Sequence, residues 1–273
     1  MKPRAWLLAS ASAVSAFGIG LLLWLGISVA LLQGNSDDLD MLRSMQRSAL
    51  VMAGVLALPG FISLLALARG TWRRAGLLAL ALALACAATL AALLAREQPD
   101  PGLVSVTAVL LAIGAIGAAL TAGMAATVDA RDSWRSQMVA PNFLAFALLA
   151  GAALLFAGVA VKGHGMDVLS APMPSLVMLL VVVAALKLLY WFENGGLRAK
   201  PASSEDLPRL RLAALALLAI IPLFLAGALA LWPQSAPRAG WCLIALSVLA
   251  GGCVERYLLA AEAGRRARSP VPG

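Results

Sequence analysis

The sequence predicts an all-α integral membrane protein: a bundle of about eight transmembrane helices that forms a single domain over residues 1–273. Hydrophobic residues make up 62% of the chain, charged residues only 12%, and the mean hydropathy is +0.91. A soluble domain is nearer half apolar and a quarter charged, so one soluble core could not hide this much apolar sequence from water. The apolar runs are also continuous, whereas the strands of a membrane barrel alternate.

Each predicted helix is an apolar run of roughly the 20 residues that a helix needs to cross the hydrocarbon layer. In order, the runs cover residues 8–32, 49–68, 75–95, 103–128, 138–161, 172–192, 210–232 and 240–262. The apolar stretch that begins at Ala5 is far longer than the roughly 7–15 apolar residues of a signal peptide, so we expect a retained first helix.

Polar or turn-forming segments separate these runs. Gly34 to Asp38 ends the first run, Glu97 to Gly102 forms a clear turn after the third, and Glu193 to Arg209 is the longest connection. Pro59 and Pro222 lie inside the second and seventh runs, where a proline can break a helix. The sequence has no internal repeat and no separate soluble domain.

The net charge of +8 lies mainly between the apolar runs, which indicates membrane topology and argues against nucleic-acid binding. Of the 21 Lys and Arg residues, fourteen lie at the termini and in the even-numbered connections, and five lie in the odd-numbered connections. Because short cytoplasmic segments carry the excess of positive charge, this bias predicts that both termini are cytoplasmic.

The chain offers few ligands for metals. Cys86, Cys242 and Cys253 lie inside apolar runs without a CxxC pair, and the single histidine, His164, lies in a connection. We therefore expect neither a haem nor an iron–sulfur cluster in this chain. The sequence also lacks the motifs of a hydrolase triad or a zinc peptidase, so we expect no metal site and no catalytic residues of its own.

Ionisable residues within apolar helices are costly and therefore worth examining. Lys187 and Tyr190 share one side of the sixth helix, and Glu255 and Arg256 lie in the eighth. A lone carboxylate at the depth of Glu255 requires a partner, which Arg256 or Lys187 could supply. The residues fit either an ion pair with an interfacial aromatic belt or a pocket for a quinone-like headgroup.

Short motifs also occur in a characteristic order. They are Trp134 followed by Pro141-Asn142-Phe143-Leu144, Lys187-x-x-Tyr190-Trp191, Leu210-Arg211 with Ile221-Pro222, and Glu255-Arg256-Tyr257-Leu258 followed by Ala261-Glu262-Ala263. This ordered set, with the helix count and length, resembles the membrane anchor subunits of dimethyl sulfoxide reductase-type molybdoenzymes. That family usually has a His-Leu-Gly-x-Pro stretch after the second helix, where this chain has Leu67 to Ala75 and no histidine. The family's usual quinol ligands are therefore not carried over.

The resemblance implies a non-catalytic subunit of an oxidoreductase complex in the bacterial inner membrane. Such a subunit tethers a molybdopterin catalytic subunit and a ferredoxin-like iron–sulfur subunit, and exchanges electrons with menaquinone or ubiquinone in anaerobic electron transport. The candidate quinone-proximal or partner-docking residues are Glu255, Arg256, Lys187, Tyr190, Trp134, Arg131 and Asp132. Two other functions fit the same composition: a small transporter or permease, and a structural membrane assembly factor.

Overall fold

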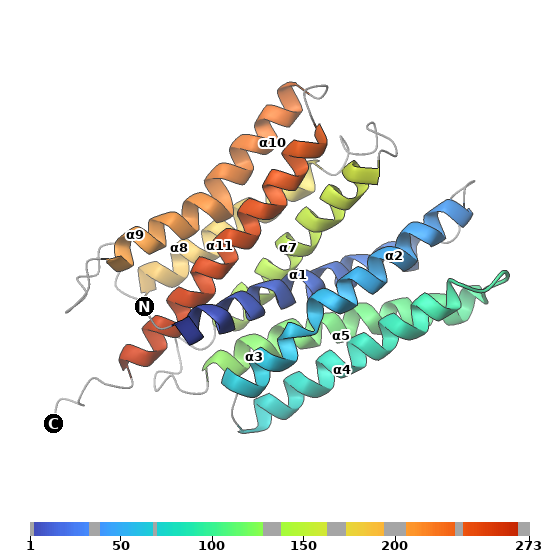
Figure 1. Ribbon diagram of the computed structural model, residues 1–273, viewed down its shortest axis with the longest axis horizontal. Helices are drawn as coiled ribbons and strands as arrows, with labels where there is room; N and C mark the ends of the chain where they lie inside the picture. The colour runs from blue at the N-terminus through green and yellow to red at the C-terminus, as the bar shows by residue number, and fades with distance from the viewer. Residues whose placement is uncertain are drawn as a thin grey trace.

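A computed structural model of the chain describes residues 3–32, 39–67, 70–127, 138–162, 173–193, 206–232 and 237–266. All regular structure in these ranges is helical, and Figure 1 shows a bundle of long helices. Eight helical spans are long and apolar enough to cross a membrane. The prediction of an all-α membrane bundle is therefore confirmed, and the chain is a multi-pass membrane protein.

Most spans consist of one helix, whereas the second and seventh are interrupted. In chain order, the helices are α1 (Pro3–Leu32), α2 (Leu39–Ala57), α3 (Pro59–Leu67), α4 (Gly70–Leu93), α5 (Pro101–Thr127), α7 (Val139–Lys162), α8 (Met173–Glu193), α9 (Asp206–Leu215), the π-helix η2 (Ala216–Ile220), α10 (Ile221–Leu231) and α11 (Pro237–Arg266).

The spans agree with the predicted ranges within a few residues, except at the start of the second. That span begins at Leu42 rather than at residue 49, because the helix continues through two arginines. Arg47 is exposed, whereas its neighbour Gln46 is buried, so the helix tolerates the charge by pointing it outward. The predicted start of the second span at residue 49 is therefore too late.

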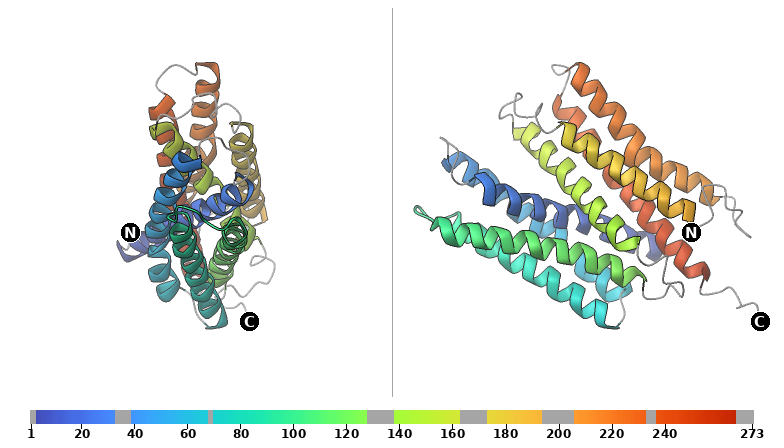
Figure 2. Two further views of the ribbon diagram at one scale, coloured as in Figure 1. Left: turned by 90° about the vertical axis from the view of Figure 1, so that its right-hand side faces the viewer. Right: turned by 180° about the vertical axis from the view of Figure 1, so that it is seen from behind.

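Helix α1 lies at the centre of the bundle and packs against α2, α3, α5, α7 and α11. Figures 1 and 2 show α4 and α5 side by side along one edge of the bundle, α8 and α10 along the other, and α1 and α7 between them. The close approach of α1 to α7 depends on glycine: a Cβ added to Gly20 would lie 1.7 Å from the Ala147 carbonyl oxygen. Small residues permit such contact between membrane helices.

The second span bends between α2 and α3, as Pro59 predicts. Proline has no N–H to donate, and the Phe61 N–H donates to Leu58 O at 3.0 Å. Ser15 on α1 donates through its hydroxyl to the Ala57 carbonyl at 3.4 Å. A side chain of the neighbouring helix thus provides a hydrogen bond at the break, which lipid could not do.

The seventh span is interrupted by η2, which comes just before Pro222. The Ile221 N–H donates to Ala216 O in the wider π pattern, and the hydroxyl of Ser247 on α11 donates to Leu217 O at 2.7 Å. A Cβ added to Gly251 would lie 2.7 Å from Leu218 Cγ, so α11 packs directly on the π segment. A proline and a neighbouring helix together account for this local distortion.

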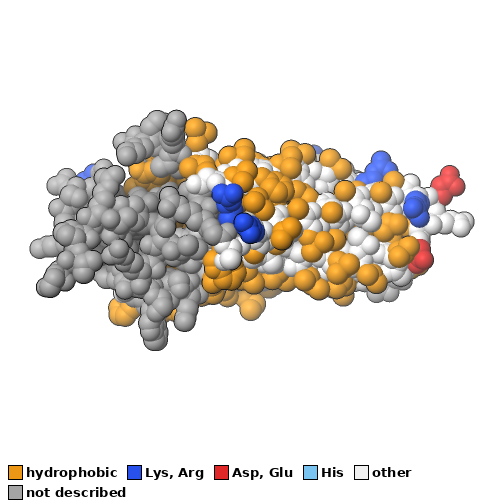
Figure 3. Space-filling model, turned by 90° about the horizontal axis from the view of Figure 1, so that it is seen from below, with side chains coloured by type: hydrophobic (Ala, Val, Ile, Leu, Met, Phe, Trp, Pro, Cys, Tyr) orange, Lys and Arg blue, Asp and Glu red, His pale blue; other side chains and the backbone are white. Residues whose placement is uncertain are grey.

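The outer surface of the bundle is apolar along its length. Large hydrophobic side chains point outward from the spans, among them Val55 at 60% and Ile62 at 61% exposure. Figure 3 shows one such face, with orange apolar side chains over most of its coloured part, blue Lys or Arg side chains beside the grey atoms, and both signs of charge at the right-hand end. This distribution is that of a lipid-facing surface.

Both chain termini lie at the same end of the bundle (Figure 1), as an even number of spans requires. We call this end, where α1 begins and α11 finishes, the terminal end. The opposite end contains the turn between α4 and α5, where Asp100 accepts hydrogen bonds from the N–H groups of Gly102 and Leu103.

Candidate functional site

The ionisable residues of α8 and α11 meet inside the bundle, near its terminal end. Lys187 Nζ on α8 donates a hydrogen bond to Glu255 Oε1 on α11, and the two side chains are only 4% and 3% exposed. The expectation that Glu255 needs a buried partner is confirmed, with Lys187 as that partner. Two charges withdrawn from water must compensate each other closely to be tolerated in such a position.

Arg256 adds a second positive charge on the other side of the carboxylate. Its Nε lies 3.5 Å from Glu255 Oε2, and its Cζ lies 3.2 Å from the centroid of the Phe143 ring. The ring of Phe146 is a second aromatic neighbour, with its centroid 5.2 Å from Cζ. The arginine is thus stabilised by an ion pair and by aromatic rings, whose negative faces attract a cation.

The N–H groups of the Arg256 guanidinium are nevertheless not used in hydrogen bonds among the described residues. Its side chain is 3% exposed, and none of its three nitrogens donates a hydrogen bond within the part of the chain that the structure describes. A buried polar group without hydrogen bonds is costly, so such a group in a native protein requires an explanation. Lys187, Glu255 and Arg256 together also carry one net positive charge.

A second apolar cluster, distinct from the main core, lies against the charged group through Phe143, whose ring covers Arg256. Its buried members come from α7, α8, α9 and α11, and are Val139, Phe143, Tyr190, Trp191, Ala214 and Leu258. Tyr190 therefore lies in the wall of the charged site, as its spacing from Lys187 predicts. The low polarity of this wall strengthens every electrostatic interaction within it.

Arg256 also lines a pocket between α1, α3, α4, α5, α7 and α11. The polar side chains of its lining are Arg256 and three serines, Ser12, Ser15 and Ser63, and the remainder are apolar or glycine. The empty volume is about 400 Å³, part of it open to the outside. Much of this volume is open solvent or narrow space between side chains, and the interior has room for about one water molecule.

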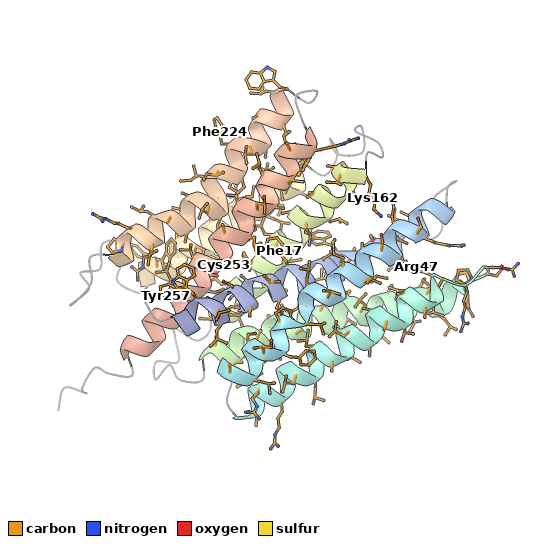
Figure 4. All side chains as sticks on the ribbon, in the orientation of Figure 1. Phe17, Arg47, Lys162, Phe224, Cys253 and Tyr257 are labelled. Atoms are coloured by element: carbon orange, nitrogen blue, oxygen red, sulfur yellow. The ribbon has the colours of Figure 1, made fainter. Side chains whose placement is uncertain are left out.

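Polar residues of the pocket lie close to the terminal end of the bundle. Ser12 lies six residues after the first residue of its span, and Arg256 lies three residues before the last residue of its own. At 1.5 Å per residue, both are within about 10 Å of the terminal end. Figure 4 shows Cys253 and Tyr257 of α11 beside the first turns of α1, and the rings of Trp6 and Tyr257 stack there with centroids 4.4 Å apart.

The structure assembles four of the seven candidate residues into one region. Lys187, Glu255 and Arg256 form a continuous charged group, and Tyr190 lies in the adjoining apolar cluster. Trp134, Arg131 and Asp132 lie outside the described residues.

Sequence reasoning did not identify the serines of the pocket. Ser12 and Ser15 precede Ala16 and Ile19 at i, i+3, i+4 and i+7 spacing, so these four lining residues share one face of α1. A small polar face on an otherwise apolar helix was therefore the sequence signal that could have identified Ser12 and Ser15. Ser63 gives no comparable signal, because it lies alone in an otherwise apolar segment of α3.

Comparison with known proteins adds no relative: no protein-family model matches the chain, and no curated protein matches its sequence.

Proposed function

We propose that this protein is the membrane anchor subunit of a bacterial molybdopterin and iron–sulfur oxidoreductase complex, and that it exchanges electrons between the quinone pool and the partner's nearest cluster. The ordered motifs that resemble this family support the proposal. The proposed location is the inner membrane, with both termini in the cytoplasm, in accordance with the distribution of positive charge.

The observation that carries the proposal is the buried charged group formed by Lys187, Glu255 and Arg256. Its two helices, α8 and α11, also contain two of the motifs that carry the resemblance. A structural ion pair would need only one cation, whereas here a second buried cation also lines a pocket. Intramembrane ionisable residues of this kind commonly mark functional sites.

The chemistry required of this chain is modest. When a quinol is oxidised, two electrons pass to the iron–sulfur partner and two protons pass to water at the membrane surface. The chain must hold the headgroup close to the terminal end, stabilise charge on its oxygens and keep the surroundings apolar. Arg256, Glu255 and the apolar cluster around them are suited to these roles.

Purification from the native membrane tests the proposal directly. A tagged chain extracted in mild detergent should carry stoichiometric iron and molybdenum with two larger subunits, and added quinol should reduce the clusters. A chain that comes out alone would contradict the anchor function. A complex whose clusters do not respond to quinol would indicate a purely structural anchor or an assembly factor instead.

A matched pair of lysine variants separates the proposed site from general effects of charge. Lys187→Met should slow quinol-dependent cluster reduction, because it removes one member of the charged group. Lys162→Met is the control: Lys162 lies on an exposed surface at the opposite end, where its Nζ donates to Ser48 Oγ at 2.9 Å (Figure 4). Equal rates in the two variants would contradict a role for the charged group.

A small transporter is the second candidate, favoured by the interrupted second and seventh spans. Transporters often bind substrate where broken helices meet. In this structure the break between α2 and α3 lies beside the pocket, to which α3 contributes Gly60 and Ser63, whereas η2 contributes no lining residue. The two interruptions therefore do not form one shared site, which makes the anchor the better-supported function.

A further inference from the structure

We propose that the pocket lined by Arg256, Ser12, Ser15 and Ser63 binds the headgroup of a membrane-soluble hydroquinone in preference to that of the oxidised quinone. Arg256 donates to one headgroup oxygen, and the serine oxygens of α1 and α3 accept from a headgroup hydroxyl. This inference rests on the proposed exchange with quinones, and adds to it the binding residues and the preferred redox form.

The donor side of the pocket is Arg256. Its guanidinium carries five N–H groups and can only donate, and its side chain is buried without a hydrogen bond among the described residues. It is held in place from behind by Glu255 and flanked by the Phe143 ring. A headgroup oxygen would satisfy donors whose burial is otherwise costly.

The acceptor side consists of two serines whose protons are already in use. Ser15 donates to Ala57 O at 3.4 Å, and Ser63 donates to Gly60 O at 3.0 Å. A hydroxyl has one proton and two lone pairs, so each of these oxygens is left with the capacity to accept. The two serines lie on neighbouring helices, since a Cβ added to Gly60 of α3 would come within 2.3 Å of Ser15 Oγ.

This arrangement of donors and acceptors distinguishes the two redox forms of the ligand. A quinone has only acceptor oxygens, so it can use Arg256 but gives the serine oxygens nothing to accept. A hydroquinone has hydroxyls, which both donate and accept, and can bond to both sides of the pocket. The reduced form therefore makes at least one more hydrogen bond in the same site.

The pocket is narrow as it stands, with room for about one water molecule at its centre. A ring therefore enters by displacing a lining side chain. The ring would replace water and side-chain atoms against Phe143 and the alanines of α5, which form the apolar part of the lining.

Equilibrium binding to the purified full-length chain tests the proposal. A naphthoquinone with a short isoprenoid tail, and its dithionite-reduced hydroquinone, would be titrated in detergent without oxygen, and binding followed by calorimetry. One extra hydrogen bond predicts that the reduced form binds about 2- to 10-fold more tightly. Equal affinities, tighter binding of the oxidised form, or no binding by the folded protein would overturn the proposal.

Variants assign the effect to this pocket. The double variant Ser15→Ala/Ser63→Ala should lose the preference while it keeps its affinity for the oxidised form, and Arg256→Gln should weaken both forms. Ala122→Leu should abolish binding by filling the pocket. The matched control is Ala85→Leu on the exposed face of α4, which should leave binding unchanged. Each variant would be checked for a monodisperse elution profile.

These outcomes are independent of the anchor function. If Ala122→Leu binds quinol like the unmodified chain, the pocket is not the site, even where the complex assembles and its clusters respond to quinol. If the tagged chain comes out without iron–sulfur partners and yet binds hydroquinone in this pocket, the anchor function fails and the binding site stands.

Discussion

At the scale of single residues, Glu255 is the centre of the charged site. It is the one buried carboxylate among the described residues, and it compensates Lys187 through a hydrogen bond and Arg256 through an ion pair at 3.5 Å. The three residues are therefore not equivalent. Loss of one cation leaves the carboxylate with the other, whereas loss of the carboxylate removes the partner that both cations share.

Because Glu255 interacts with both cations, its substitution should destabilise the protein more than the substitution of Lys187. Glu255→Gln should lower the free energy of unfolding by about 3–5 kcal/mol, the usual cost of breaking a buried ion pair by removing one partner. Lys187→Met should cost less, about 1–3 kcal/mol, because Arg256 still neutralises Glu255. Reversible unfolding in mixed detergent micelles would measure both. Lys162→Met serves as the control and should change stability by less than about 0.5 kcal/mol, since Lys162 is exposed. The opposite order would contradict the central position of Glu255.

At the scale of helices, the close approach of α1 to α7 depends on glycine, which has no side chain. Helix α1 contacts five other helices, and Gly20 on α1 and Gly151 on α7 lie against each other's backbones. Lipid is as apolar as leucine, so membrane helices gain little from hydrophobic burial against one another and rely on packing instead. The glycine contact therefore contributes to holding α7, and with it Phe143, beside α1 and α11.

Alanine substitutions at two glycines of α7 test how closely this helix packs against α1. A Cβ on Gly151 would lie 2.1 Å from the Gly20 carbonyl carbon, whereas a Cβ on Gly158 would meet nothing within 4 Å. Gly151→Ala should therefore lower the free energy of unfolding by about 1–3 kcal/mol through overpacking. Gly158→Ala should be neutral or slightly stabilising, because alanine favours the helix. Equal effects of the two substitutions in micelle unfolding would show that the contact between α1 and α7 is not tight.

The π segment of the seventh span gives a second prediction at this scale. Ser247→Ala would leave Leu217 O without its bond to α11 and should lower the free energy of unfolding by about 0.5–1.5 kcal/mol. The control is Thr89→Ala on α4, because the Thr89 hydroxyl bonds only to its own helix, at Ala85 O, on an exposed face. A smaller effect at Ser247 than at Thr89 would show that α11 does not stabilise the π segment.

The sequence predicts the helical spans better than it predicts which residues of different helices contact each other. The spans follow from length and hydropathy because lipid imposes both, and Pro59 and Pro222 predict the interruptions because proline lacks an N–H. A partner for Glu255 could be expected from the cost of burying a carboxylate. The choice of Lys187 could not, because it depends on how α8 packs against α11.

The pocket lay beyond sequence reasoning for the same reason. Its lining comes from six helices, and its polar members are separated by long stretches of chain, from Ser12 to Arg256. No local periodicity relates residues on different helices, so only the packing of α1 against α3, α7 and α11 brings them together. The position of Arg256 in the eighth span predicts that it lies near Glu255, but only the three-dimensional packing shows that it also lines the pocket.

At the scale of the whole molecule, the two ends of the bundle differ in what they contain. The terminal end carries the charged group, the pocket and both chain ends, whereas the opposite end carries the α4–α5 turn and the exposed Lys162 (Figures 1 and 4). An anchor must receive its soluble partner near the quinone site, since electron transfer requires the two to be close. The partner is therefore expected at the terminal end, and the side of the membrane on which that end lies decides where the complex works.

The excess of positive charge at the termini and even-numbered connections predicts a cytoplasmic terminal end. A green fluorescent protein fused after Arg266 should fluoresce, and an alkaline phosphatase fused there should be inactive, because each of these reporters folds in only one of the two compartments. An alkaline phosphatase inserted at Asp100, in the turn at the opposite end, should be active. The reverse pattern would place the termini and the partner outside the cytoplasm. Active phosphatase at both positions would contradict the five spans between Asp100 and Arg266 and, with them, the meeting of α8 and α11 that forms the charged site.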